Sequence, residues 1–559
     1  MKKKNLFAVA LATVLSASAI AGCGAKEEAL ENNAETEVVE STEDAAEAAE
    51  EASEEASEDA ATETEEVSEE SSGAKKLVAG ATTGFFGAES LDVAYNWDGW
   101  LMSIFGISEN LFRLDSNFVP QPWLVSDYKQ VDDTTWVFTI KDGIKFSNGT
   151  DVTAQAVKDC FDRTYANNDR ADSTLSIESM EADGQDLTIK TTQPNPTILN
   201  DLCDPLLGIY DANAEVDEVL GVSCTGPYVA TEFTAMSEVK MVKNEYYWGG
   251  EPKLDEVELK ILDDTNALQM ALQNGEIDMI AQLDASSTKL FTGDDNFVVE
   301  GVTSTRSDFL MYNLNTKGLD DQAVRYAIGY CIDRDNFANV VYEGYATSSY
   351  GIYPEGIAYG GTDGLDIPVD KYDVEKAKEI LAEAGYTDSD NDGILDKDGE
   401  KLSFNAITYS YNDASIQLGD MLQSSLKEAG IELKITTYDV LDEYLADGAY
   451  DIAILSYAMA PTGTPQYFVN MLFTTGASNN YAGYSNATVD ELAGELATEF
   501  DTDKQTEIAK KICQEVVTDR PFDFVIHQQL ICVWNKKVSG VTVNPTEYYL
   551  IDANIDVEE

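Results

Sequence analysis

The apolar positions between residues 136 and 146 alternate with polar ones, as they do in β-strands that bury one face. An Asp-Gly pair at positions 142–143 interrupts the alternation and supplies the residue types that tight hairpin turns favour. The pattern predicts a β-hairpin with these inward positions: Trp136, Phe138, Ile140, Ile144 and Phe146.

Three later stretches repeat apolar residues every three or four positions, which is the spacing of one face of an α-helix. The predicted helices begin at Thr153, near Tyr372 and before Leu418, and the last two end at glycines 385 and 430. Residues 431–435 then alternate as a strand. The predicted buried positions are Val157, Cys160, Phe161 and Thr164; Val374, Ala377, Leu381 and Ala384; and Leu418, Leu422 and Leu426.

No internal repeat is visible in residues 77–559, where strands and helices alternate irregularly. This arrangement indicates an α/β chain of mixed α+β type.

The first residues follow a different pattern, in which the basic segment Met1–Asn5 precedes the apolar run Leu6–Ala21 and then Cys23. Small residues before a cysteine are what a lipoprotein signal peptidase requires, so residues 1–22 are predicted to be a signal peptide and Cys23 a lipidated N-terminus. The alternative is an ordinary secretory signal cut after Ala19. Either interpretation predicts an exported protein.

Acidic residues dominate the segment Glu27–Ser72, which has 20 of them and no basic residue. Such a stretch repels itself and buries little apolar surface, so residues 23–76 are interpreted as the lipidated cysteine and a disordered tether. The whole chain carries 103 Asp and Glu against 36 Lys and Arg, a formal net charge of -67. Nucleic acid is therefore a poor partner, because its binding needs a cationic face.

Cysteines in the body of the chain fall into two groups. Cys160, Cys331 and Cys532 stand on apolar stripes and are predicted to be core residues. Cys203 and Cys224 lie in loop-like sequence at a separation that a disulfide can close, which makes them a candidate pair in an exported protein.

Catalytic chemistry finds little support in the sequence. The sole histidine, His527, lies in the apolar run 524–531 and is interpreted as a core or strand-face residue rather than a general base. No Cys/His metal spacing or phosphate-binding loop occurs, since the glycine-rich segment 80–87 lacks a lysine. No carboxylate pair stands out, so the chain is predicted not to be an enzyme and to need no cofactor.

One acidic turn has calcium-loop spacing. Asp388, Asp390 and Asp392 precede Gly393, as in the first half of such a loop, but Gly399 occupies the position where a bidentate glutamate belongs. A structural calcium ion and a solvated acidic turn are both retained as interpretations.

Several motifs together resemble one family. The segment Trp123–Tyr165 is similar to the signature region of the family 5 extracellular solute-binding proteins, the peptide and nickel receptors of ABC importers. Further similarities follow in the family's order: Thr225–Tyr228, Asn244–Gly249, Gly275–Asp278, Asn313–Asn315 with Val324-Arg325, Ile332–Arg334 and Ala382–Tyr386. The resemblance covers nearly all of residues 77–559.

This resemblance implies a two-lobed fold of the type II periplasmic-binding-protein kind that closes over a ligand. The implied parts are lobe I, residues 77–112, 231–308 and 526–559; a small domain inserted in lobe I, residues 113–230; and lobe II, residues 309–525.

The resemblance also implies the candidate ligand-binding residues. Tyr95, Trp97 and Trp100 lie in a segment that lines the cleft in relatives, although lobe core is an equal alternative. Arg170 stands where nickel-binding relatives hold a carboxylate, although a lone arginine in so acidic a chain is often a surface ion pair.

Lobe II contributes the loop 456–468, from which Tyr457, Thr462 and Thr464 are candidates. Peptide-binding members have an aspartate here for the peptide amino group, and this chain has no acid in that loop. The nickel branch's histidine, expected near residues 478–480, is absent too, and Leu206 replaces an arginine that helps to hold the metal chelate. Neither subfamily's ligand chemistry is therefore intact.

The sequence thus predicts a monomeric substrate-binding lipoprotein, anchored outside the cytoplasm, that delivers an oligopeptide or peptide-like solute to a permease and its ATPases. A nickel or metal-chelate receptor is the alternative within the family. A secreted carboxylate-dependent hydrolase and a structural lipoprotein are the alternatives from other classes. The ligand itself and the Gram type of the host stay open.

Overall fold

The computed structural model describes residues 74–558. The predicted signal peptide, Cys23 and most of the acidic tether lie outside the described residues. Within the described part, no helix combines the length and the apolar character that crossing a bilayer requires.

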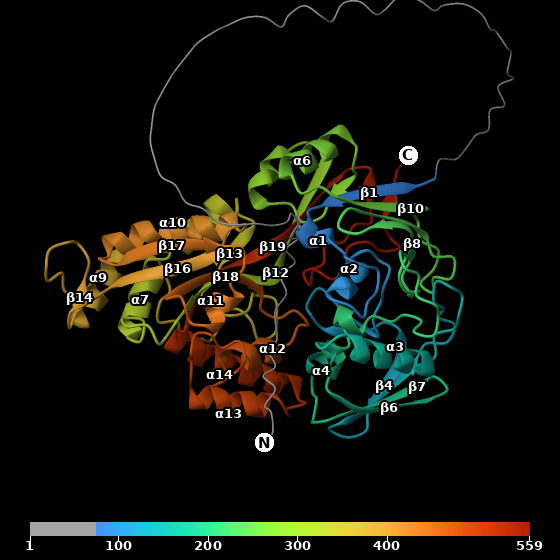
Figure 1. The fold of residues 1–559 in the computed structure, drawn as a ribbon, viewed down its shortest axis with the longest axis horizontal. Helices are drawn as coiled ribbons and strands as arrows, with labels where there is room; N and C mark the ends of the chain where they lie inside the picture. The colour runs from blue at the N-terminus through green and yellow to red at the C-terminus, as the bar shows by residue number, and fades with distance from the viewer. Residues whose placement is uncertain (1–73, 559) are drawn as a thin grey trace, which may run out of the picture. The chain divides into compact units, whose positions relative to one another are not determined.

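Two long antiparallel strands, β12 (Phe297–Tyr312) and β19 (Phe522–Asn535), form the centre of an 11-stranded sheet (Figure 1). On one side of them lie β18, β16 and β17, and on the other side β11, β1, β10, β9 and β8. The predicted chain crossings, at 308–309 and 525–526, fall within these two strands.

The pairing of β12 with β19 is irregular at that crossing. Its register shifts between Thr303 and Ser307 and again between Asp308 and Phe309. Bulges of this kind bend a strand and increase its twist, so the two halves of each strand enter different parts of the molecule. One half packs with lobe I and the other with lobe II.

Lobe I holds the following elements: β1 (Lys76–Ala81), α1 (Thr83–Phe86), α2 (Asp98–Ile104), β8 (Tyr228–Thr234), β9 (Glu238–Lys243), β10 (Glu256–Ile261), α6 (Thr265–Asn274), β11 (Met279–Ile280), η2 (Ala285–Leu290), β20 (Val538–Ser539) and β21 (Asp556–Val557). The part between residues 112 and 207 comprises β2 (Phe112–Leu114), β3 (Pro120–Pro122), β4 (Val125–Gln130), β5 (Thr135–Ile140), α3 (Ala154–Asn167), α4 (Ala171–Thr174), β6 (Ile177–Asp183), β7 (Asp186–Thr191), α5 (Ile198–Asp201) and η1 (Pro205–Leu207). Here β4, β5, β7 and β6 form a separate antiparallel sheet.

Lobe II comprises α7 (Gln322–Tyr330), α8 (Arg334–Asn336), η3 (Phe337–Val341), β13 (Ala346–Ser348), α9 (Val374–Glu383), β14 (Asp396–Lys397), β15 (Glu400–Lys401), β16 (Ser403–Tyr409), α10 (Asp413–Glu428), β17 (Glu432–Tyr438), α11 (Asp442–Ala446), β18 (Ile452–Ala458), α12 (Gln466–Phe468), η4 (Val469–Phe473), α13 (Ala487–Leu496) and α14 (Thr502–Asp519).

Alternate residues of β12 belong to different apolar cores. Phe309 and Met311 belong to one apolar cluster of lobe II, and Leu310 and Tyr312 belong to another. Because successive side chains of a strand point to opposite faces, the sheet of lobe II is covered on both sides. A third and larger cluster fills lobe I and includes Leu530, Cys532 and Trp534 of β19.

The structure confirms the three predicted helices as α3, α9 and α10. Thr153 caps α3 by accepting a hydrogen bond from the Ala156 amide, and the predicted stripe of this helix is buried. Gly385 and Gly430 follow α9 and α10 with φ angles of +91° and +85°, a conformation that glycine adopts without strain.

The predicted hairpin is wrong in its pairing. β5 pairs with β4 and β7, whereas residues 144–146 leave the sheet after the Asp-Gly turn. The Phe146 amide instead donates to the Thr150 carbonyl, and the Val152 amide donates to the Ile144 carbonyl. A tighter turn follows the predicted one, and alternation alone does not reveal which partner a strand takes.

The six cysteines of the described residues are all buried and free. The predicted pair is not joined: the Cys203 thiol donates to the Leu199 carbonyl, and the Cys224 thiol donates to the Val222 carbonyl. Cys224 stands in a β-bridge with Tyr210, whereas Cys203 follows α5, so each thiol is satisfied locally.

Candidate functional site

Arg170 and Trp97, two of the predicted ligand-binding residues, are in direct contact. The guanidinium carbon of Arg170 lies 3.4 Å from the centroid of the Trp97 ring. No described carboxylate is within ion-pair distance of Arg170, so the alternative of a surface ion pair does not hold. A half-buried guanidinium that rests on an indole keeps its edge donors available for an anionic ligand group.

Local hydrogen bonds hold this pair in place. Asn168 accepts from the Arg170 amide at 3.1 Å and donates to the Asn96 carbonyl at 3.2 Å, which ties the two segments together. Arg163 of α3 forms a bidentate ion pair with Asp92. Neither contact was predicted, because each joins segments about 70 residues apart in the sequence.

Trp100 connects the same segment to the strand crossing. Its indole nitrogen donates to the Glu547 carbonyl at 3.0 Å, and its ring packs edge-on against Phe85. The Glu547 carboxylate pairs with Arg306 of β12 at 3.0 Å, and this neighbouring charge raises the pKa of Arg306. Trp100 is therefore a packed residue that is connected through Glu547 to β12, close to the strand crossing.

Tyr95 is exposed, and its hydroxyl donates to Asn167 at 3.1 Å. Its ring faces Arg163 rather than Arg170, with the guanidinium carbon 5.9 Å away. Tyr95 thus contacts α3 rather than Arg170.

Three residues outside the predicted set join the site. Burial raises the pKa of Tyr467, which Arg170 opposes and Asp204 reinforces. Burial also raises the pKa of Tyr548, and Asp204, Arg170 and Tyr467 all act on it. Arg170, Asp204, Tyr467 and Tyr548 therefore influence one another electrostatically, and Tyr467 belongs to lobe II.

The predicted lobe II residues are placed differently. Tyr457 packs edge-on against Phe309 and stacks on Phe468, which makes it part of the lobe II core. Thr462 and Thr464 are buried, and the Thr464 hydroxyl accepts from the Gln466 amide. The Thr462 carbonyl accepts from Asn200 of lobe I at 2.8 Å, a direct contact between the lobes.

Sequence reasoning missed Tyr467 although it lies in the loop that was singled out. Nothing in the sequence distinguishes Tyr467 from the other tyrosines of lobe II, and its side chain is 43% exposed. Nothing in the sequence marks Asp204 as a ligand-binding residue. Its carboxylate caps the short turn η1 by accepting a hydrogen bond from the Leu206 amide, a common structural role for aspartate.

The acidic turn at Asp388, Asp390 and Asp392 brings one oxygen of each carboxylate within 4.8 Å of the others. These donors suit calcium, but the Lys401 ammonium bonds to Asp390 at 2.8 Å and also to Asp392. Lys401 thus supplies a positive charge to the turn from within the chain. A calcium ion here would compete with that ammonium.

His527 lies at the strand crossing and contacts Ser349, with the imidazole Nε2 2.8 Å from the hydroxyl oxygen. Burial lowers the pKa of His527 to about 3. Both residues are at most 5% exposed. A histidine this weakly basic is neutral at physiological pH and is a poor general base, so the contact supports the predicted core role.

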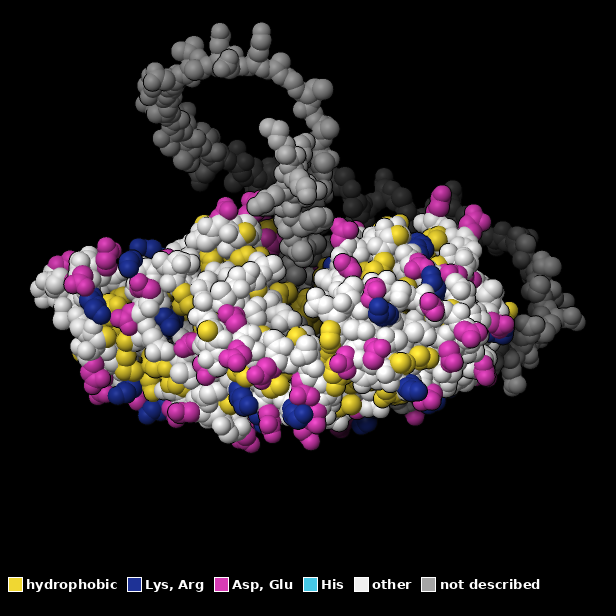
Figure 2. Space-filling model, turned by 90° about the horizontal axis from the view of Figure 1, so that it is seen from below, with side chains coloured by type: hydrophobic (Ala, Val, Ile, Leu, Met, Phe, Trp, Pro, Cys, Tyr) yellow, Lys and Arg dark blue, Asp and Glu magenta, His cyan; other side chains and the backbone are white. Residues whose placement is uncertain are grey.

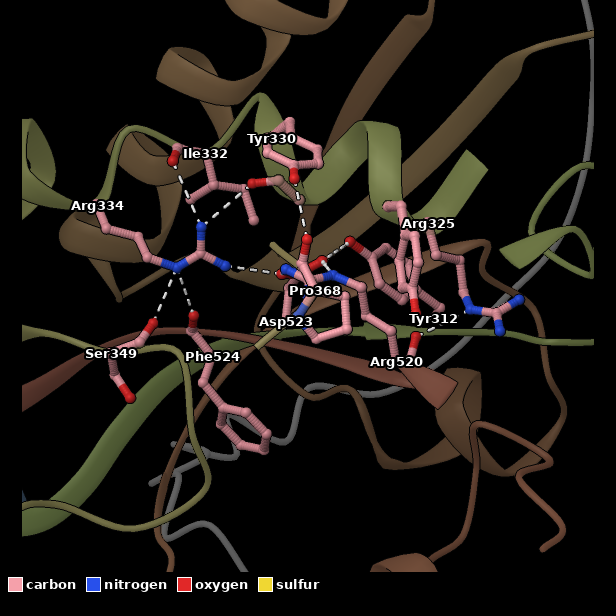
Figure 3. Close-up of polar contacts among 12 residues, drawn as sticks. Tyr312, Arg325, Tyr330, Ile332, Arg334, Ser349, Pro368, Arg520, Asp523 and Phe524 are labelled. Carbon is pink, nitrogen blue, oxygen red and sulfur yellow. Dashed lines mark hydrogen bonds and ion pairs between the residues drawn. The ribbon is translucent and has the colours of Figure 1, made fainter. Parts of the chain in front are cut away.

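Two arginines of the family-like motifs lie in a buried network within lobe II (Figure 3). Arg334 donates to the carbonyls of Ser349 and Phe524 and forms an ion pair with Asp523 at 2.7 Å. Asp523 also accepts from Arg520 and Tyr312. The remaining motif arginine, Arg325, donates to the carbonyls of Arg520, Leu319 and Asp519.

The motif Asn244–Gly249 also has a packing role. Tyr247 and Trp248 donate to the buried carboxylate of Glu109 at 3.2 and 2.8 Å, and Trp123 donates to it at 2.9 Å. Burial raises the pKa of Glu109, and these donors oppose the rise. These motif residues therefore contribute to the packing of lobe I.

Charged side chains are dispersed over the visible surface. Figure 2 shows acidic groups spread across one face, with lysines and arginines standing among them rather than gathered in a patch. On this face nothing resembles the cationic stripe that a nucleic-acid backbone requires.

Two lobes joined by two strand crossings, with an arginine of lobe I resting on an aromatic ring, define a two-lobed binding protein for a small solute. The model of the bacterial extracellular solute-binding proteins, family 5 (middle region), matches residues 119–480. The chain belongs to this family. It is a substrate-binding protein of an ABC importer and acts outside the cytoplasm.

Relatives with different ligands resemble the chain. The nickel-binding protein NikA of Staphylococcus aureus is 30% identical over 81% of this chain and 89% of the relative. The oligopeptide-binding protein AppA of Bacillus subtilis is 25% identical over 73% of this chain and 78% of the relative. The crystal structure of S. aureus NikA in complex with Ni(L-His)2 superposes with a TM-score of 0.71 at 28% identity, covering 87% of this chain and all of that one.

Proposed function

We propose that this protein captures a small, amino-acid-derived solute with a carboxylate, such as an oligopeptide or peptide-like compound, and delivers it to a permease. The contact between Arg170 and Trp97 carries the proposal, because it presents guanidinium donors that have no carboxylate partner in the described chain. Asp204 would hold a cationic group of the solute, in place of the aspartate that the lobe II loop lacks.

Binding measured by calorimetry tests the role of Arg170. Protein stripped of co-purified solute is titrated with di- to pentapeptides, with glutathione and with the same peptides amidated at the carboxyl end. Arg170→Ala should weaken binding of free-carboxylate peptides by roughly 100-fold, the cost of a charged hydrogen-bonded pair. The matched control is Asp169→Ala, an exposed neighbour.

Amidated peptides should bind the wild type and Arg170→Ala equally. If Arg170→Ala binds free-carboxylate peptides as tightly as the wild type does, the carboxylate site lies elsewhere.

A metal chelate is the second candidate, supported by the similarity to the nickel-binding relative. The sole histidine of the chain is buried against Ser349, so a metal ion would arrive with its coordination sphere already filled by small ligands. Titrations with Ni(II) alone, with L-histidine alone and with the two together distinguish a metal-chelate receptor from a peptide receptor. Binding of only the mixture supports a chelate, and native mass spectrometry of protein from its own host would show one mass rather than many.

The lipid anchor follows from Cys23 and the small residues before it. Cys23→Ala should release the protein from the membrane fraction, and unchanged membrane association would contradict the anchor. We further infer a monomer without catalytic activity; turnover of a peptide or glycoside panel would contradict the latter.

A further inference from the structure

Phe118 lies at the tip of the β2–β3 turn in lobe I and has an unusual backbone, with φ at +61°. Asp115 fixes this turn: its carboxylate accepts from the amides of Asn117 and Val119 at 2.8 and 3.0 Å, and its carbonyl accepts from the Phe118 amide. A non-glycine residue adopts such a conformation only where the surroundings hold it. The turn thus directs Phe118 away from its own strands.

The Phe118 side chain is buried in the other lobe. Only 6% of it is exposed, and it belongs to the apolar cluster that contains Met459, Ala460 and Phe468 of lobe II. Gly463 lies directly against it: a Cβ atom at Gly463 would stand 2.4 Å from the Phe118 carbonyl oxygen. Because Cβ atoms in proteins do not come this close to another heavy atom, only glycine fits at position 463.

A second phenylalanine makes the reciprocal contact. Phe500, between α13 and α14 of lobe II, packs against the apolar core of lobe I. The hydrogen bond from Asn200 of lobe I to the Thr462 carbonyl lies in the loop that also holds Gly463. Each lobe therefore has one aromatic ring against the core of the other, with Phe118 buried and Phe500 partly buried, and a polar contact accompanies Phe118.

We propose that Phe118 and Phe500 form an aromatic clasp that holds the lobes closed and sets the open–closed equilibrium of this receptor. Neither ring is part of the Trp97–Arg170 site, so the clasp contributes the same free energy whichever solute is bound. The apparent affinity for any solute rises with the fraction of closed protein, because only that form offers the complete site.

Distances between spin labels on the two lobes test the clasp without any ligand. Labels are attached at Asp142→Cys in lobe I and Asp503→Cys in lobe II, both exposed positions, in full-length Cys23→Ala protein. The described native cysteines are buried and should stay unlabelled. Electron–electron double resonance then compares Phe118→Ala, Phe500→Ala, the double variant and Val119→Ala.

Val119 is the matched control because it is the next residue of the same turn and is 49% exposed. Phe118→Ala should reduce the ratio of closed to open protein by roughly 10- to 100-fold, the effect of losing a buried phenyl group, and Phe500→Ala should reduce it by less because that ring is only partly buried. The distance distribution should therefore move to longer values, most of all in the double variant, while Val119→Ala keeps the wild-type distribution.

Asn200→Ala, which removes only the accompanying hydrogen bond, should move the distribution in the same direction by less. Near-ultraviolet circular dichroism checks that each variant is folded. Wild-type distance distributions in both Phe118→Ala and Phe500→Ala would overturn the clasp, whatever solute the protein binds.

Discussion

Three arginine side chains illustrate two kinds of surroundings in this protein. Arg325 and Arg334 are surrounded by backbone carbonyls, which fix their guanidinium groups inside lobe II. Arg170 has an indole on one face and no described carboxylate partner. The first kind stabilises the fold and the second is suited to a ligand, because only the second has donors to spare.

The carboxylate of Asp523 should be essential for stability, since it compensates the charges of Arg334 and Arg520 with its side chain fully buried. Asp523→Ala should lower the free energy of unfolding by about 3–5 kcal/mol, the cost of leaving a buried charge without its partner. Urea unfolding measures it. Asp320→Ala, which breaks an exposed pair with Lys317, should cost at most about 1 kcal/mol; equal losses would contradict the argument.

Asp98 should make stability depend on pH. Burial raises its pKa to about 6, although Ser90 and Glu89 donate hydrogen bonds to it. The folded state therefore binds this proton more tightly than the unfolded state, and the stabilisation present at low pH is lost as the pH rises from about 4 to about 6.

Asp98→Asn should lack this pH-dependent contribution to the free energy of unfolding. The unfolding free energy of the wild type minus that of the variant is expected to fall by up to about 3 kcal/mol between pH 4 and pH 7, as a shift of about two pKa units implies. Urea unfolding at both pH values measures the change. A difference that is constant with pH would show that Asp98 does not titrate in this range.

At the scale of elements, local chemistry predicts helices better than strand partners. The N-cap at Thr153 and the glycines after α9 and α10 are contained in the chain near each helix. The strand partners of β5 cannot be inferred from nearby residues. β4 precedes it and β7 follows it in the chain, and residues 144–146 pair locally instead.

Lys401 should weaken the binding of calcium to the acidic turn before β14. Calorimetric titration of the wild type with calcium is expected to give weak binding, because the Lys401 ammonium already contacts Asp390 and Asp392. Lys401→Ala should bind calcium more tightly, and adding Asp390→Ala should abolish the gain. Tight binding by the wild type, unaffected by Lys401→Ala, would mean that the ammonium does not compete.

At the scale of the whole molecule, β12 and β19 contribute to the cores of both lobes. Val298 and Val302 of β12 pack on the lobe I core, whereas Phe309 of the same strand lies in lobe II. A strand shared in this way should couple the unfolding of the two lobes.

Phe309→Ala tests this coupling. Loss of the buried ring should destabilise the protein by about 3–5 kcal/mol. If the lobes unfold together, amide exchange should quicken in β10 of lobe I as well as in β16 of lobe II. Unchanged exchange in β10 with faster exchange in β16 would show that the lobes unfold separately.

Of the candidate site, the sequence predicted the pair that relatives suggest, Trp97 and Arg170, and the structure brings these two together. It also suggested Tyr457, which lies in the core, and overlooked Tyr467 ten positions later. Both tyrosines have the same residue type and similar neighbours in the chain. Only the packing of the loop decides that Tyr457 joins the lobe II core and that Tyr467 stays exposed.

The sequence by itself determined the class of fold, the helices α3, α9 and α10, and the acidic character of the chain, because caps, periodicity and composition act over a few residues. The tertiary structure alone decided that the motif arginines are buried, that Cys203 and Cys224 stay apart, and that Phe118 lies in lobe II. These outcomes depend on contacts between residues up to several hundred positions apart, and such contacts form only when the two crossing strands bring the lobes together.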